Sequence, residues 1–455
     1  MASEAKIFMD QVALSGYLEA VFYILATLGV MIAIAGIILI DVSLVKKENI
    51  VDTAVQKILC VFIGGASFMV VGYAIWNWQY DQAFAVPNSL GQAISDWSIF
   101  GTALTHFSQN LDPAAYPTAD TFQIFSIFFF CFAGLAAVLL HGAGLERIKP
   151  RAAYATVIIM AGIVLPVAEY LTYGSASFLT NMGLHDYVGA YCVYMVVGVW
   201  AVVLAWRLGP RLVIPSGPND FTMLSVGVLL LLIGIPLFVV GCGFLVPGQG
   251  FFGPSMSTSG LGIVFTNVFL AFSGGAVAGG LISYRTRKPA YILLGPVAGY
   301  VACTALFDIA LPWQAFIIAL FGPVILYAGE AVLRRFKIDD AKVAPLALGP
   351  SVFSAIVAGI IGRGIPQGGY FGLKDGSFAF QHAHISLEMQ LLGIAVIVGG
   401  TAIIAFIVTV LIEKTIGLRL AEGEEKLGLD ASFWTKPAMP QMTDMPFVPE
   451  PVSDN

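Results

Sequence analysis

Residues 417–430 read GLRLAEGEEKLGLD and directly follow an apolar segment at 389–413. The stretch consists of a Gly-Leu-Arg turn, an acidic run and a Gly-Leu-Asp turn. Beyond it, the chain carries Pro and Met residues among polar ones, a composition typical of disordered segments. We therefore divide the sequence into a membrane domain at 1–414 and a tail at 415–455, with the tail partly disordered from about residue 431.

The composition of the chain is that of a membrane protein. Of its 455 residues, 58% are hydrophobic and 11% are charged, and the mean hydropathy is +0.86. A soluble domain is not built from this ratio. The apolar stretches are continuous and long, whereas the strands of a membrane barrel alternate over about ten residues. The sequence predicts an all-α integral membrane protein with eleven spans, at 18–41, 55–77, 122–142, 152–172, 186–206, 221–245, 259–282, 290–307, 314–333, 344–362 and 389–413.

Lys and Arg are unevenly distributed among the connections between these spans. The connection from Trp78 to Thr121 carries none, and its side of the membrane has only Lys6, Arg363 and Lys374. Positively charged connections stay on the cytoplasmic side. We therefore expect an inner-membrane protein with an external N-terminus and a cytoplasmic tail, and no cleaved leader before a mature start near Met1. The positive connections hold Lys46, Lys47, Arg147, Lys149, Arg151, Arg207, Arg211, Arg285, Arg287, Lys288, Arg334, Arg335, Lys337 and Lys342.

Motifs for other functions are not found in the sequence. The five cysteines are scattered within the predicted spans, and His382 and His384 lie in an external loop without metal-ligand spacing. The chain has no phosphate-binding loop, dinucleotide fingerprint, nucleophile elbow or basic aromatic patch. We expect neither an enzyme nor a nucleic-acid-binding protein, and neither a metal site nor a cofactor. The many glycines within the spans indicate close helix packing.

Two carboxylates lie at the external ends of predicted spans, where ionisable side chains are costly and are therefore functional candidates. Asp186 opens the fifth span, and Glu169 lies near the end of the fourth. Both would add negative potential to an outer vestibule and attract a small cation. Asp186 equally suits the N-cap of its helix, and Glu169 an interfacial carboxylate. Tyr191 and Tyr194 follow on one helical face, which either packs in the core or lines a path.

The tail stretch and several other segments resemble the ammonium transporter superfamily of Amt, Mep and Rh proteins. The resemblance runs in order across nearly the whole chain. It implies a homotrimer in the lipid bilayer, with helices one to five repeated in inverted orientation by helices six to ten. It also implies a PII-type signal protein as a candidate partner at the tail. Besides the tail, the segments that carry the resemblance are Gly36–Asn49, Gly144–Arg147, Asp186–Gly189, Ile233–Gly241 and Asn267.

The resemblance also implies a set of pore residues. Two stacked phenylalanines gate the pore in the family, and they map to Phe132 and Phe238. A tryptophan and a serine recruit the cation there. Their positions hold Tyr173, or Gly174 with a one-residue shift, and Cys242.

The two pore histidines of the family are replaced in this chain. Each follows an aspartate by eight residues, and both aspartates, Asp186 and Asp340, are kept. The histidine positions hold Tyr194 and Leu348. Histidine, with a pKa of about 6.5, passes protons near neutral pH, tyrosine at about 10 does so far less readily, and leucine cannot.

These replacements alter the function that the resemblance implies. We expect a channel or transporter for ammonium, ammonia or a related small molecule, such as methylamine or a neutral gas, with a changed mechanism. The alternative is a nonconducting ammonium sensor or scaffold subunit that uses the same fold.

Overall fold

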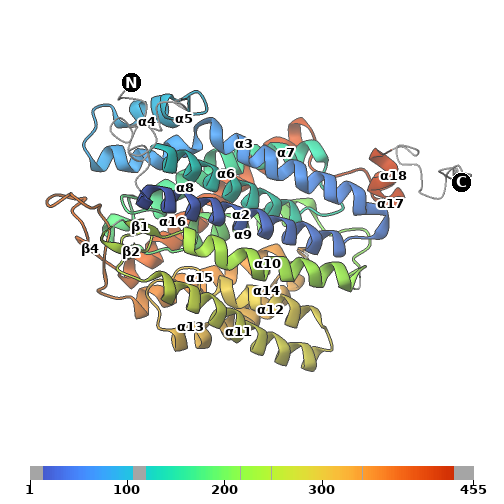
Figure 1. The fold of residues 1–455 in the computed structure, drawn as a ribbon. Coiled ribbons are helices and arrows are strands. Elements are labelled where there is room, and N and C mark those ends of the chain that lie inside the picture. The colour runs from blue at the N-terminus through green and yellow to red at the C-terminus, as the bar shows by residue number, and fades with distance from the viewer. Residues whose placement is uncertain (1–13, 106–118, 216, 247, 341, 435–455) are drawn as a thin grey trace, which may run out of the picture.

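The computed structural model describes residues 14–105, 119–215, 217–246, 248–340 and 342–434, which form a bundle of long helices lying along one direction (Figure 1). Two antiparallel two-stranded pairs, β1 with β2 and β3 with β4, lie at one end of the bundle. The helices are α2 (Leu14–Ser43), α3 (Ile50–Ala83), α4 (Ser89–Trp97), α5 (Thr102–Thr105), α6 (Ala119–Gly142), α7 (Pro150–Ile159), α8 (Leu165–Thr172), α9 (Val196–Leu208), α10 (Phe221–Gly241), α11 (Leu261–Thr286), α12 (Ala290–Val301), α13 (Pro312–Ala319), α14 (Phe321–Arg335), α15 (Val343–Ile361), α16 (Leu387–Thr415), α17 (Glu422–Leu427) and α18 (Leu429–Phe433). The strands are β1 (Phe244–Val246), β2 (Gly250–Phe252), β3 (Pro366–Gln367) and β4 (Ala383–His384).

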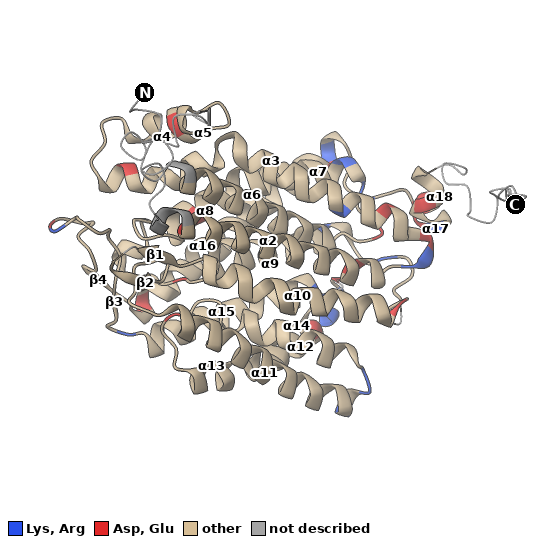
Figure 2. Ribbon diagram, viewed as in Figure 1, with Lys and Arg blue, Asp and Glu red and all other residues tan. Residues whose placement is uncertain are grey.

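The two ends of the bundle differ in charge. We call the end where α16 finishes and α17 and α18 lie the tail end, and the end with β1–β4 the loop end (Figure 1). Lys and Arg gather at the tail end, whereas the loop end has few (Figure 2). The connections that the sequence analysis grouped on one side of the membrane therefore meet at one end of the molecule.

Ten helical stretches of the described residues are long and apolar enough to cross a membrane. They correspond to ten of the eleven expected spans. The eighth, expected at 290–307, differs because it contains a helix of only twelve residues, α12. The ten stretches are Leu18–Ser43, Lys47–Ala83, Thr121–Gly142, Pro150–Thr172, Ala190–Leu208, Phe221–Gly241, Leu261–Thr286, Pro312–Arg335, Val343–Ile361 and Leu387–Thr415.

Side chains from neighbouring helices explain why α12 ends early. The Asn267 amide donates to the backbone oxygens of Phe307 and Ala310, both at 2.8 Å, and the Ser354 hydroxyl accepts from the Ala305 amide at 2.9 Å. Backbone without regular helical bonds is tolerated at membrane depth only where other protein groups satisfy it. The segment 302–310 meets this condition, because its neighbours supply the partners that a longer helix would have provided.

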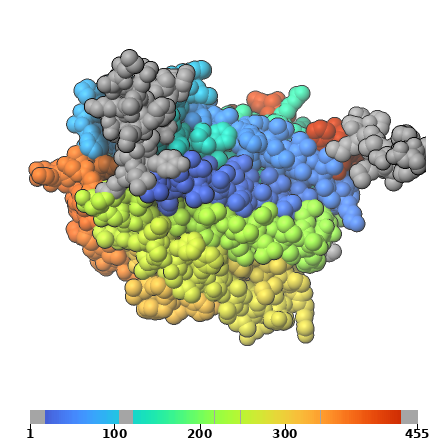
Figure 3. All heavy atoms as spheres, viewed as in Figure 1, coloured from blue at the N-terminus to red at the C-terminus, as the bar shows by residue number. Residues whose placement is uncertain are grey.

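Close packing between α2 and α10 builds the centre of the bundle. A Cβ atom added at Gly36 would lie 2.6 Å from the Gly227 carbonyl oxygen, so these helices approach to backbone distance. On the outside, α2, α10 and α11 lie side by side on the face shown in Figure 3. Their outward side chains are apolar, as at Leu229, Ile233 and Leu281, which are each more than half exposed. A continuous apolar exterior of this kind faces lipid or another protein.

The tail stretch is docked onto the bundle by its two turns. At the first turn, Leu418 accepts from the Lys149 amide at 3.0 Å, and the Arg419 guanidinium donates to the Leu208 oxygen at 2.8 Å. At the second turn, the Asp430 carboxylate accepts from the amides of Val51 and Asp52, at 3.1 and 2.7 Å. It thereby caps the free amides at the start of α3. The helix α18 ends at Phe433, and the part of the tail after residue 434, where most of the expected partial disorder falls, lies outside the described residues.

A buried ion cluster joins the connections at the tail end. Arg211 holds Asp339 through two nitrogens, at 2.8 and 2.9 Å, and contacts Glu146 at 3.0 Å. Burial alone would raise the pKa of Asp339, but the hydrogen bond and charge of Arg211 and the charge of Arg147 outweigh it, and the pKa is lowered. Asp339 therefore stays ionised and ties the connection before α15 to the connection after α9.

Candidate functional site

An aromatic pocket opens at the loop end. Its volume is about 370 Å³. Rings supply most of its wall, so it can hold a small organic or inorganic cation against π faces. The lining residues are Asn77, Tyr80, Phe84, Trp97, Phe122 and Tyr370.

A column of aromatic rings continues from this pocket into the bundle. Successive ring centroids lie between 4.4 and 6.3 Å apart, within the range of favourable aromatic pairs. Side chains from α3, α6, α10, α12 and the loop between β3 and β4 contribute to it, and so the column depends on five separate parts of the sequence. In order, it contains Tyr370, Tyr80, Trp76, Phe125 with Phe129, Phe128, Phe132, Phe238 and Tyr300.

Glu169 enters this column from α8. It lines a small space of about 10 Å³ together with Phe132 and Tyr173, and its side chain is buried. Its Oε2 atom has no hydrogen-bond partner among the described residues. A buried carboxylate without a donor is costly and is therefore suited to a positively charged ligand.

The two expected gate residues meet. The rings of Phe132 and Phe238 have centroids 5.6 Å apart, but their planes form an angle of 87°. They are therefore packed edge to face, whereas the resemblance implied two stacked rings. Edge-to-face packing places the positive edge of one ring against the negative face of the other, so the two rings are in direct contact.

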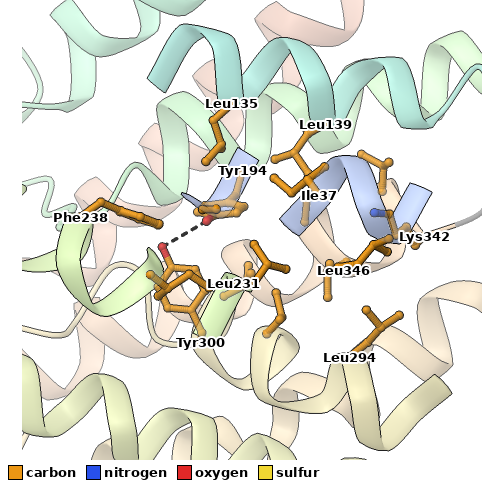
Figure 4. Close-up of a pocket in the computed structure, with 17 residues that line it drawn as sticks. Ile37, Leu135, Leu139, Tyr194, Leu231, Phe238, Leu294, Tyr300, Lys342 and Leu346 are labelled. Atoms are coloured by element: carbon orange, nitrogen blue, oxygen red, sulfur yellow. Dashed lines mark hydrogen bonds between the residues drawn. The ribbon is translucent and has the colours of Figure 1, made fainter. Parts of the chain in front are cut away.

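An apolar cavity of about 40 Å³ lies behind this contact (Figure 4). Its walls come from α2, α6, α10, α12 and α15, through side chains such as Leu135, Leu231 and Leu294. At one end, the Tyr194 hydroxyl donates to the Tyr300 hydroxyl at 3.1 Å. At the other end lies Lys342 (Figure 4).

A larger pocket of about 620 Å³ follows at the tail end. It lies between the connection at 210–217, the end of α14 and the pair Asp339 and Asp340. Lys342 lines the apolar cavity and Asp340 lines this pocket, so the segment before α15 borders both spaces. We call the larger space the tail-end pocket.

The two aspartates retained from the family both act as helix caps. The Asp186 carboxylate accepts from the amides of Ala190 and Tyr191, at 2.8 and 3.0 Å, at the start of the π-helical stretch Ala190–Met195. Asp340 accepts in the same way from the amides of residues 342–344, at 2.7–2.9 Å. Both side chains are thus engaged by backbone amides at the start of a helical stretch.

Two further residues that the resemblance assigned to the site, Tyr173 and Leu348, differ in whether they line one of these spaces. Tyr173 lines the space beside Glu169, and its hydroxyl donates to the backbone oxygen of Cys242 at 3.4 Å. Leu348 is not among the residues that line the cavity. A Cβ atom built at Gly198 would lie 2.8 Å from the Leu348 backbone nitrogen and Cβ, which places Leu348 against α9.

Sequence analysis did not identify Tyr300 or the aromatic pocket. Tyr300 lies 106 positions from Tyr194, and no local pattern relates the two. The ring-rich stretch Phe125–Phe132 was a usable signal, because five phenylalanines in eight residues cannot all face one side of a helix.

A buried histidine and carboxylate connect the segments at the loop end. The Nε2 atom of His185 lies 3.0 Å from Asp308, and its Nδ1 lies 2.7 Å from the Gln367 side-chain oxygen. The Gln367 amide nitrogen donates to the oxygens of Leu184 and Thr180, so its oxygen faces the ring. Burial lowers the pKa of His185, but Asp308 and the Gln367 oxygen outweigh it, and the pKa is raised.

Comparisons with known proteins agree over most of the chain. The model of the Ammonium Transporter Family matches residues 21–438. The ammonium transporter Amt1 of Methanocaldococcus jannaschii is 26% identical over 426 residues, which cover 91% of this chain and 95% of the relative. The ammonium transporter of Bacillus subtilis is 25% identical over 424 residues, covering 91% and 96%.

Two solved structures share the fold. A structure described as a sensor Amt protein has a TM-score of 0.72 and 20% identity, and the match covers 92% of this chain and 99% of that one. Mep2 of Candida albicans has a TM-score of 0.68 and 20% identity, and the match covers 91% and 88%.

Proposed function

Because this chain belongs to the ammonium transporter family, we propose that it moves ammonium nitrogen across the bilayer along the aromatic column and the apolar cavity. The molecule that crosses is ammonia, or a small neutral relative such as methylamine. The observation that carries this proposal is the apolar cavity directly behind the contact of Phe132 and Phe238. Its volume of about 40 Å³ exceeds the roughly 10–15 Å³ that one water-sized molecule needs.

Recruitment takes place on the loop-end side of the gate. An ammonium ion gains attraction from the ring faces of the column and from the free carboxylate oxygen of Glu169. An ion cannot continue cheaply into an apolar cavity, because its hydration is lost there. The ammonium ion therefore transfers one proton to the Glu169 carboxylate, which leaves ammonia and a neutral carboxylic acid.

The neutral molecule then passes when the rings of Phe132 and Phe238 separate. Beyond them it meets the pair of hydroxyls of Tyr194 and Tyr300. Because Tyr194 donates to Tyr300, the proton of Tyr300 is free to bind a nitrogen lone pair. This polar contact replaces the histidines of the family without offering a proton acceptor near neutral pH.

The same proposal extends to the topology of the chain. We place the loop end outside and the tail end in the cytoplasm, since Lys and Arg gather at the tail end. Counting α12 with segment 302–310 gives eleven crossings, which leaves the N-terminus outside. The matching caps formed by Asp186 and Asp340 support an inverted repeat. A homotrimer and a PII-type protein at the docked tail rest on family membership.

The test is flux into liposomes that contain the purified protein and an internal pH dye. An inward ammonium gradient should make the lumen alkaline faster than in protein-free liposomes, because ammonia takes up a proton inside. A solid-supported-membrane recording should show no saturable steady current. A saturable current would contradict neutral passage, and equal alkalinisation with and without protein would contradict transport.

A nonconducting sensor is the second candidate function. It is supported by the likeness to the structure described as a sensor Amt protein and by the closed contact of Phe132 and Phe238. Isothermal titration with ammonium together with the liposome assay distinguishes the two functions, because a sensor would bind ammonium without alkalinising liposomes.

A further inference from the structure

Three charged side chains meet at the end of the apolar cavity that Lys342 lines. Asp41 lies near the end of α2, Lys57 lies in α3, and Lys342 directly precedes α15. The ammonium group of Lys57 contacts one carboxylate oxygen of Asp41, and that of Lys342 contacts the other. Asp41 and Lys57 are fully buried and Lys342 is 5% exposed. We call these three residues the lysine cluster.

The charges of the lysine cluster do not cancel. Two ammonium groups share one carboxylate, which leaves one positive charge. Within the described residues, the ion pairs give neither lysine a second carboxylate. Asp340 lies nearby in sequence, but its oxygens are occupied by backbone amides of α15. The other titratable neighbours among the described residues are the thiol of Cys60 in α3 and the imidazole of His141 at the end of α6, and neither is a carboxylate.

The cavity cannot compensate for this charge. Its walls are almost entirely apolar, and the polar groups among its lining residues are Lys342 and the hydroxyls of Tyr194 and Tyr300. A charge in such surroundings acts over a longer distance than it does in water, because little screens it. A cation in the cavity would be repelled at the end by which it has to leave, whereas a neutral molecule would not.

A purely structural role does not account for the second lysine. The pair of Lys57 and Asp41 already joins α2 to α3, and Lys57 also donates to the Val138 oxygen of α6 at 2.9 Å. Lys342 adds a buried charge to a pair that is already neutral, which is costly for stability. A function that needs the extra positive charge explains its presence.

We propose that Lys342, held by Asp41 and Lys57, is a specificity-determining residue that blocks cations at the inner end of the cavity and lets neutral molecules pass. The proposal rests on the transport function proposed above. It assigns the discrimination between ammonia and ammonium to two places, the carboxylate of Glu169 before the gate and the positive charge of Lys342 behind the cavity.

The decisive comparison is between Lys342→Met and Lys342→Arg in liposomes. Lys342→Met leaves the neutral pair of Asp41 and Lys57, so a saturable ammonium current should appear, at least about tenfold above the protein-free background at which the unchanged protein stays. Lys342→Arg keeps the charge, so its current should stay at the original level. Lys288→Met removes an exposed charge that lines the tail-end pocket and should change the current less than about twofold.

Alkalinisation of the same liposomes keeps this test separate from that of the transport function. Ammonia flux should be similar in the unchanged protein and in Lys342→Met, since a neutral molecule does not respond to the charge. Equal currents in Lys342→Met and Lys342→Arg would overturn the charge barrier, whether or not ammonia flux is present. Loss of ammonia flux in the unchanged protein would overturn the transport function instead.

The folding of the variants is checked by monodisperse elution and by thermal unfolding. Lys342→Gln, which keeps a polar side chain of similar length, provides a second removal of the charge. A raised current in both Lys342→Gln and Lys342→Met supports the barrier. A raised current in Lys342→Met alone would indicate a packing defect and would contradict it.

Discussion

The hydroxyl of Tyr194 donates to the hydroxyl of Tyr300 at 3.1 Å, at the end of the apolar cavity next to Phe238. The family resemblance assigned Tyr194 to a histidine position, and Tyr300 comes from a different helix, α12. Apart from Lys342 at the other end, the pair supplies the polar groups of the lining. It can hold a neutral amine through hydrogen bonds, but it cannot relay its proton near pH 7.

The first prediction concerns this pair. Tyr194→Phe should reduce methylamine and ammonia flux about fivefold, because one neutral hydrogen bond contributes about 1 kcal/mol. The measurement is the initial rate of alkalinisation in liposomes. Tyr191→Phe is the matched control, since Tyr191 lies on the same helical stretch and binds Gln390 instead of lining the cavity. An equal loss in both variants would contradict a specific role for Tyr194.

The second prediction concerns the free carboxylate in the aromatic column. Glu169→Gln should weaken ammonium binding by roughly tenfold or more, because a charge-assisted hydrogen bond contributes about 1.5–3 kcal/mol. Isothermal titration of the purified protein measures this affinity. Glu388→Gln serves as control, because Glu388 is an exposed carboxylate at the loop end that pairs with Arg363. Unchanged affinity in Glu169→Gln would exclude Glu169 from the cation site.

The third prediction concerns the docked tail. Asp430→Ala removes the cap from the amides of Val51 and Asp52 and should cost about 1 kcal/mol. Hydrogen exchange should accelerate at these two amides and in α18. Asp220→Ala removes a comparable cap from α10 and should leave the tail protected. Unchanged exchange in α18 after Asp430→Ala would show that the cap does not hold the tail.

The fourth prediction is a pH dependence of stability at the loop end. The pKa of His185 is raised in the folded protein. Its contribution to the free energy of unfolding is therefore complete below the unfolded-state pKa of about 6.5, and it is lost as the pH rises through the folded-state pKa. The thermal midpoint should therefore fall as the pH increases above about 6.5. His185→Gln should remove this part of the dependence, and His382→Gln should retain it. If the thermal midpoint varied with pH in the same way in the unchanged protein and in both variants, the assignment of this dependence to His185 would be contradicted.

Much of the fold follows from local sequence. Ten of the eleven expected spans are present as long apolar helical stretches, because a helix in lipid satisfies its own backbone and needs only a continuous apolar run. The expected eighth span was harder to predict, since α12 is ended by hydrogen bonds from Asn267 and Ser354, which lie in other helices.

The site was predictable only in part. Tyr194 lines the cavity and Phe132 meets Phe238, at positions that the family resemblance assigned. Leu348, assigned in the same way, lies against Gly198, because the approach of α15 to α9 at that glycine determines which of its residues face inward. Neighbouring residues of α15, such as Ala347, line the apolar cavity instead of Leu348.

The sequence by itself determined the membrane location of this protein and its family, because composition and motifs are properties of neighbouring residues. Only the tertiary structure decided that Tyr194 pairs with Tyr300 and that Lys57 and Lys342 share Asp41. These contacts join residues that are 106, 16 and 301 positions apart. They depend on how the helices pack, and no periodicity along the chain encodes the packing of side chains from different helices.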